Sequence, residues 1–148
     1  MVEPNPVACT APIMDAMIDL TRLSKAHRVI AAGASALDIY LDLHERGFSR
    51  VGTTATCRTP CGRHDVGLVA GRHSMQALEA LLVRIVPFLN ARATVAVWVD
   101  SGAGQHGGKR LQLLLERLGF RIEAGARCEN GVVVSAQRRE WSEVANAA

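Results

Sequence analysis

The chain has 148 residues, a formal net charge of +3, 49% hydrophobic residues and 21% charged residues. This length suffices for one domain with one core, and the composition excludes a disordered or fibrous protein. No apolar run approaches the roughly 20 residues of a membrane-spanning helix, and residues 1–12 lack the pattern of a secretory signal. We therefore expect a cytoplasmic protein that does not enter membranes.

Helical and strand-like patterns alternate in the first half of the chain. A helix is predicted from Pro12 to Ser24, because apolar residues recur there at helical spacing. A short apolar strand, Arg28–Gly33, follows and ends at a glycine, as buried parallel strands do. A second helix is predicted over Ser35–Arg46 and a second strand over Arg50–Ala55.

The same alternation continues through the middle of the chain. Asp65–Gly71 is predicted to be a third strand, and Ser74 is suited to cap the next helix. That helix is predicted over Met75–Leu89, where leucines and isoleucines form one stripe. Ala93–Val99 has the most continuous strand pattern and ends at Asp100.

The last third of the chain predicts one more helix and a hairpin. A glycine-rich loop leads into a helix that Gly119 ends. Phe120–Cys128 and Val132–Gln137 are strand-like runs joined through Asn130-Gly131, a strong hairpin signal. The full alternation predicts an α/β fold with three layers: a doubly wound, mostly parallel sheet with a C-terminal antiparallel hairpin.

We predict a single α/β domain over residues 12–140, between a flexible arm at 1–11 and a tail at 141–148. In doubly wound sheets a ligand binds outside the carboxyl ends of the strands. Those ends are predicted at Gly33, Thr54, Gly71 and Asp100, so ligand-binding residues are expected there.

In order and pattern, Ile13–Gly33, Asp65–Leu89 and Gly108–Phe120 with the closing hairpin resemble the class I S-adenosylmethionine-dependent methyltransferases. The resemblance implies a methyltransferase-like Rossmann sheet into which the hairpin's last strand inserts. The stretch from Ala55 to Asp65 is too short for the family's next helix and strand, so one edge of the sheet is expected to be truncated.

The resemblance also implies S-adenosylmethionine as cofactor, held by the residues Gly33, Ala34, Ser35, Thr54 and Gly71. The sequence departs from the family at this site. Ala31 stands where the family has an acid, and Ser35 and Leu37 stand where it has glycines. The stretch Gly52–Thr56 has no acid to hold the ribose hydroxyls, and no residue is indicated as a general base.

Two functions therefore remain open. In the first, the protein is a methyltransferase-like enzyme that binds S-adenosylmethionine or a related nucleotide weakly. In the second, it is a non-catalytic interaction or oligomerisation module, and the exposed sheet edge pairs with another copy. The basic residues are scattered, and six aromatic residues offer little for base stacking, so nothing in the sequence supports nucleic-acid binding.

The loop before the third strand raises a separate hypothesis. Cys57, Cys61 and His64 lie within eight residues, and His73 follows, so they could in principle supply the four ligands of a zinc site. The spacing departs from the usual two residues between cysteines, and no second pair follows. We therefore favour a turn with half-buried cysteines and no metal; a reactive cysteine, activated by Arg58 and Arg63, is the other alternative.

Overall fold

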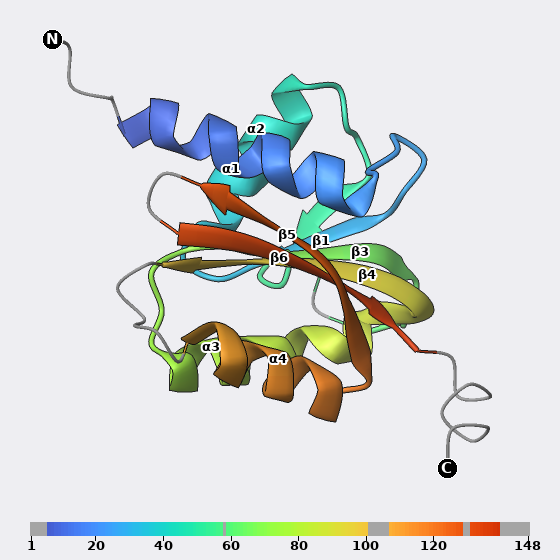
Figure 1. The fold of residues 1–148 in the computed structure, drawn as a ribbon. Helices are drawn as coiled ribbons and strands as arrows, with labels where there is room; N and C mark the ends of the chain where they lie inside the picture. The colour runs from blue at the N-terminus through green and yellow to red at the C-terminus, as the bar shows by residue number, and fades with distance from the viewer. Residues whose placement is uncertain (1–5, 58, 101–106, 129–130, 140–148) are drawn as a thin grey trace, which may run out of the picture.

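A computed structural model describes residues 6–57, 59–100, 107–128 and 131–139 of the chain. Helices cover both faces of one sheet, with α1 and α2 on one face and α3 and α4 on the other (Figure 1). The helices and strands are α1 (Pro6–Thr21), β1 (Val29–Ala32), α2 (Ala36–Glu45), β2 (Val51–Thr53), β3 (His64–Val69), α3 (Met75–Ile85), the 3-10 turn η1 (Val86–Phe88), β4 (Leu89–Asp100), α4 (Gly107–Arg117), β5 (Phe120–Cys128) and β6 (Gly131–Arg138).

The six strands lie in the order β2-β1-β3-β4-β6-β5. β1 pairs in parallel with β2 and β3, and β3 pairs in parallel with β4. β6 inserts between β4 and β5 and runs antiparallel to both. The predicted three-layer fold with its antiparallel hairpin is therefore confirmed. The hairpin's turn, residues 129 and 130, lies outside the described residues.

The truncation predicted at one edge is also confirmed. β2 forms this edge, with only three residues, and its one partner among the described strands is β1. Between β2 and β3 the described residues form turns and bends and contain no helix or strand. The edge therefore ends where the resemblance implied a missing helix and strand.

Apolar side chains alternate between the two faces of the sheet. Met14 and Met17 of α1 are fully buried on one face, in the same cluster as Val29 and Ala31 of β1. Ile30 of β1 points to the other face and packs in the cluster formed by α3 and α4. Because helices cover both faces, all four residues of β1 are buried, as the continuous apolar run predicted.

Three boundaries differ from the predictions by four residues or more, and prolines account for two of them. The first helix begins at Pro6, so residues 6–11 belong to α1 and not to a flexible arm. Pro6 occupies the first turn, where a missing N–H costs nothing, whereas Pro12 lies inside the helix. α3 ends at Ile85, because Pro87 cannot continue its hydrogen bonds.

The third difference concerns β4, which begins at Leu89, four residues before the predicted start at Ala93. Its register with β3 shifts between the pairs His64–Leu89 and Val66–Thr94, so the strand starts with an irregular segment. Polar residues in that segment hid its strand character in the sequence. No helix among the described residues is long and apolar enough to cross a bilayer.

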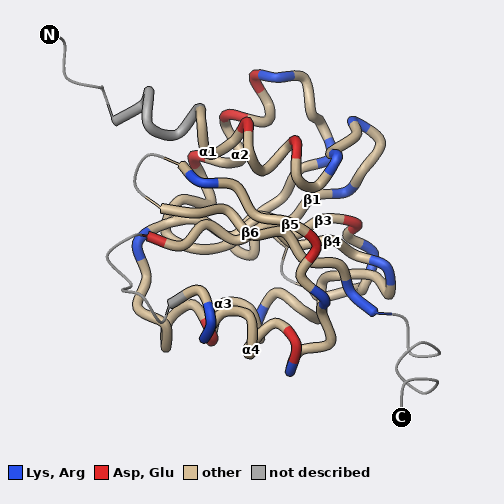
Figure 2. The backbone as a smooth tube through the Cα atoms, viewed as in Figure 1, with Lys and Arg blue, Asp and Glu red and all other residues tan. Residues whose placement is uncertain are grey.

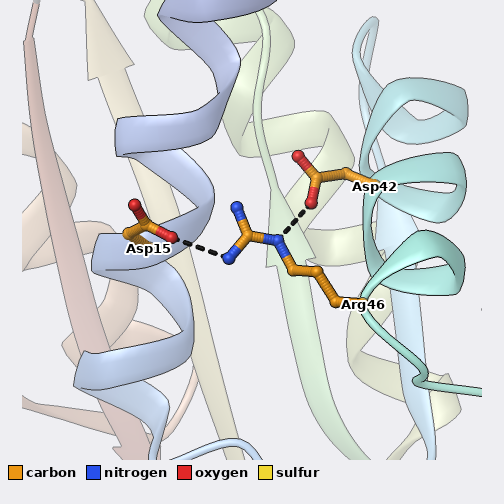
Figure 3. Close-up of polar contacts among 3 residues, drawn as sticks. All are labelled: Asp15, Asp42 and Arg46. Atoms are coloured by element: carbon orange, nitrogen blue, oxygen red, sulfur yellow. Dashed lines mark hydrogen bonds and ion pairs between the residues drawn. The ribbon is translucent and has the colours of Figure 1, made fainter.

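A charged cluster joins the two helices on one face of the sheet. Arg46, just after α2, lies between Asp15 of α1 and Asp42 of α2 and forms ion pairs with both (Figure 3). The Arg46–Asp15 distance is 2.7 Å. Hydrogen bonds to Asp15 and then to Asp42 raise the pKa of Arg46 above its ordinary value. These contacts link α1 to α2.

Candidate functional site

The loop after β1 satisfies its own backbone donors. Ala34 N–H donates to Nε2 of His73 at 3.0 Å, and Ser35 N–H donates to the carbonyl oxygen of Ala70 at 3.2 Å. Ala36 N–H, at the start of α2, donates to the carbonyl oxygen of Gly33 at 3.1 Å. Three successive N–H groups of the predicted cofactor loop are therefore bound within the protein, and none of the three is free to bind a ligand.

Two glycines make room for the His73 imidazole. A Cβ placed on Gly33 would lie 2.9 Å from Cε1 of His73 and 2.6 Å from the carbonyl oxygen of Ala70. A Cβ placed on Gly71 would lie 2.7 Å from the same Cε1. Both glycines have a positive φ, +97° and +126°. The two glycines therefore leave room for the His73 side chain.

The hydrogen bonds also define the form of the His73 ring. Because Nε2 accepts the Ala34 N–H, the neutral ring carries its hydrogen on Nδ1. Nδ1 is buried and has no hydrogen-bond partner. The ring therefore binds the loop backbone through Nε2 but leaves its own Nδ1 without a hydrogen-bond partner.

Threonines occupy the carboxyl end of β2. Thr54 N–H donates to the carbonyl oxygen of Ala31 at 3.2 Å, which holds Thr54 beside β1. The Thr53 and Thr56 hydroxyl groups lie 3.3 Å apart, and Thr56 Oγ1 also donates to the carbonyl oxygen of Thr53. The ends of β1 and β2 carry no carboxylate among the described residues, as the sequence indicated.

A polar hollow of about 550 Å³ lies at the ends of β3 and β4. Arg72, His73 and Ser74 line it from the segment before α3, Asp100 from β4 and Arg110 from α4. Arg72 Nε lies 3.7 Å from the Asp100 carboxylate, and Ser74 accepts the N–H of Ala77 as the cap of α3. The hollow lies on the α3–α4 side of His73.

The structure brings four of the five predicted cofactor residues together. Gly33, Ala34 and Gly71 lie against the His73 ring, and Ser35 binds the carbonyl oxygen of Ala70 beside them. Thr54 directly follows the neighbouring strand β2. Their binding of a cofactor stays a prediction. His73 was considered in the sequence only as a zinc ligand. Its position just after a predicted strand end was the available signal for a role at this edge.

The described residues contain no cluster of side chains that suits the hypothetical zinc site. His64 begins β3 and binds the carbonyl oxygen of Phe88 through Nδ1, whereas His73 follows the opposite end of the strand. Cys57 contacts the core under α3 and α4, and Cys61 is exposed. Among the described residues no three metal-binding side chains lie together. Arg58, one of the two arginines proposed to activate a cysteine, lies outside the described residues. In β5, burial raises the pKa of the Cys128 thiol.

The fold is that of class I S-adenosylmethionine-dependent methyltransferases. A 1,6-didemethyltoxoflavin N1-methyltransferase from Burkholderia thailandensis, with bound S-adenosylhomocysteine, superposes with a TM-score of 0.64 at 18% identity; 91% of this chain and 80% of that one are covered. A precorrin-6y C5,15-methyltransferase from Geobacter metallireducens gives a TM-score of 0.58 at 10% identity, covering 87% and 88%.

A third structure, the magnesium protoporphyrin IX methyltransferase of Synechocystis with bound S-adenosylhomocysteine, gives a TM-score of 0.57 at 10% identity, covering 93% of this chain and 89% of that one. No protein-family model matches the chain, and no curated protein matches its sequence. At such identities the similarity extends to the fold, and the site has to be judged on its own residues.

Those residues do not fit the cofactor in the manner that the resemblance implied. The loop amides that would approach the ligand are bound to His73, Ala70 and Gly33. The space that Gly33 and Gly71 leave open is filled by the His73 ring. No acid stands at the end of β1 or β2 to hold an amine or a ribose.

Proposed function

We propose that this chain is a non-catalytic protein that keeps the methyltransferase fold without binding S-adenosylmethionine. The hydrogen bond from Ala34 N–H to His73 Nε2 is the observation that carries the proposal. It engages the backbone N–H of Ala34, one of the predicted cofactor residues, and holds the imidazole against the loop. A ligand would have to break this bond and displace the ring before it could contact the loop.

Calorimetric titration with S-adenosylmethionine and S-adenosylhomocysteine tests this proposal. We expect no binding heat for the natural chain at ligand concentrations of about 1 mM. A dissociation constant of about 1 mM corresponds to a binding free energy of about −4 kcal/mol. The variant His73→Ala frees the Ala34 N–H, so binding by this variant alone would locate the obstruction at the imidazole. Micromolar binding by the natural chain would contradict the proposal.

The truncated edge favours self-association as the way in which such a module acts. β2 pairs on one side only, so no other strand among the described residues covers its outer side, where Thr53 is bound to Thr56 and Cys57 of its own turn. Leu37 and Leu41 of α2, which packs beside β2, are 63% and 51% exposed and lie one helical turn apart. A second copy related by a two-fold axis would bury the same residues twice.

Sedimentation equilibrium with a paired variant tests the self-association. The natural chain is expected to form dimers, and Leu37→Lys with Leu41→Lys is expected to shift it to monomers, because four lysines would meet at the interface. The matched control is Val83→Lys with Leu113→Lys. It changes two aliphatic residues on α3 and α4 whose exposure, 52% and 58%, is similar. A monomeric natural chain, or equal effects of both pairs, would exclude the interface.

A further inference from the structure

The loop after β1 is held by two acceptors that respond differently to acid. The N–H of Ala34 donates to Nε2 of the His73 imidazole at 3.0 Å, whereas the N–H of Ser35 donates to the carbonyl oxygen of Ala70 at 3.2 Å. A backbone carbonyl oxygen remains an acceptor whenever the chain is folded. An imidazole nitrogen loses this capacity when the ring takes up a proton, because both ring nitrogens are then donors.

A protonated His73 ring does not suit the closed position. Its Nε2–H would face the N–H of Ala34 across the 3.0 Å that now separates donor from acceptor. The other ring nitrogen gives no compensation, since Nδ1 is buried and has no hydrogen-bond partner among the described residues. Burying a charged group without an acceptor is strongly unfavourable, so an imidazolium has to leave the space between Gly33 and Gly71.

The charged groups beside His73 do not hold an imidazolium in that position. Arg72 precedes it in the chain and Arg110 of α4 lines the same hollow, and both oppose an added positive charge. The Asp100 carboxylate pairs with Arg72 at 3.7 Å, at the end of the sheet where basic and acidic positions adjoin in Figure 2. Residues 33–35 and the first turn of α3 carry no charged side chain.

The polar hollow beside the ring has room for it. The hollow measures about 550 Å³ and His73 itself lines it. Since one water molecule takes up about 30 Å³ in the liquid, this space holds a five-membered ring together with water. The turn of the side chain leaves the next helix in place, because Ser74 caps α3 by accepting the N–H of Ala77 and not through any contact with the ring.

We propose that His73 is a pH-sensitive closing element of this fold. The neutral ring closes the loop after β1, and the protonated ring turns into the hollow, which frees the Ala34 N–H and the space between Gly33 and Gly71. The proposal rests on the proposed function in that both require the His73 ring to close the loop. It adds a second state of the same loop, which acid alone produces.

NMR spectroscopy of the ¹⁵N-labelled chain tests this proposal on a single hydrogen bond. An N–H···N bond transmits a scalar coupling between its two nitrogen nuclei, so the bond from Ala34 to His73 can be observed directly. We expect the coupling at about pH 7.5 and its loss at about pH 4.5, roughly two units below the value at which imidazole in water takes up a proton. The Ser35 N–H is the internal control, because its carbonyl acceptor keeps it bound at both pH values.

Two histidine variants complete the test. His73→Gln replaces the ring nitrogen by an amide oxygen that does not titrate, so the Ala34 amide resonance is expected to lose its dependence on pH in this range. The matched control is His64→Gln, at the other end of β3, where Nδ1 binds the carbonyl oxygen of Phe88. This variant is expected to keep the response of Ala34 seen in the natural chain. Circular dichroism at both pH values confirms that each chain is folded.

The outcomes separate this proposal from the proposed function. A coupling that persists at about pH 4.5, or an unchanged Ala34 response in His73→Gln, would overturn the pH response and leave the proposed function standing. No coupling at about pH 7.5 would overturn both, since the closing hydrogen bond would then be absent. A coupling lost in acid, together with micromolar binding of S-adenosylmethionine at neutral pH, would support the pH response and contradict the proposed function.

Discussion

Gly33→Ala is expected to lower the free energy of unfolding by about 2 to 4 kcal/mol more than Gly119→Ala does. The two glycines have nearly the same φ, +97° and +93°, so the strain of placing an L-residue there is shared. The two positions differ in the room that surrounds an added Cβ atom. The Cβ of alanine at position 33 would lie 2.6 Å from the backbone oxygen of Ala70, whereas nothing lies within 4 Å of one at position 119.

Urea unfolding of the two variants and the natural chain measures this difference. Since the strain of a positive φ cancels between the variants, the remainder reports how tightly the β1 loop packs against Ala70 and His73. Equal losses in the two variants would mean that the loop has room beside Gly33, and the closed crevice on which the proposed function rests would then be in doubt.

Gly131→Ala is expected to be the other severe substitution, with a loss of about 3 kcal/mol or more. Gly131 begins β6 and is paired with Asp100 of β4. A Cβ there would lie 2.1 Å from the backbone oxygen of Val99 and 3.0 Å from Nε1 of Trp98. A backbone atom at this distance cannot yield without separating β4 from β6.

Gly125→Ala provides the control on the neighbouring strand. Its Cβ would meet the Val133 carbonyl oxygen at 3.6 Å, an ordinary contact, and alanine suits a strand better than glycine does. We expect this variant to unfold within about 0.5 kcal/mol of the natural chain. Comparable losses for the two variants in thermal or urea unfolding would show that the β4–β6 contact is looser than the structure indicates.

The layers of this fold could be predicted from the sequence because the spacing of apolar residues reflects which faces of the helices and strands are buried. The continuous apolar run of β1 reflects a strand covered on both faces, and the Asn-Gly signal predicted the hairpin that pairs β6 with β5. The helix start at Pro6 could not be predicted in the same way, since Pro6 and Pro12 both suit a first turn and periodicity does not separate them.

The candidate site was predicted less completely. Strand ends identified Gly33 and Gly71 as neighbours, but the ring that lies between them comes from a histidine 39 residues away from Ala34. No local pattern distinguishes a histidine that accepts a backbone N–H from one on the surface.

The position of β6 also bears on how the chain folds as it is made. β6, the last described strand, lies between β4 and β5, and the first helix, α1, packs over β4, β5 and β6. Helix α1 therefore has no complete surface to cover until residues beyond 130 have left the ribosome. Contacts of this sequence separation slow folding. The apolar face of α1, which includes Met14 and Met17, thus lacks its complete covering surface until β6 has been made.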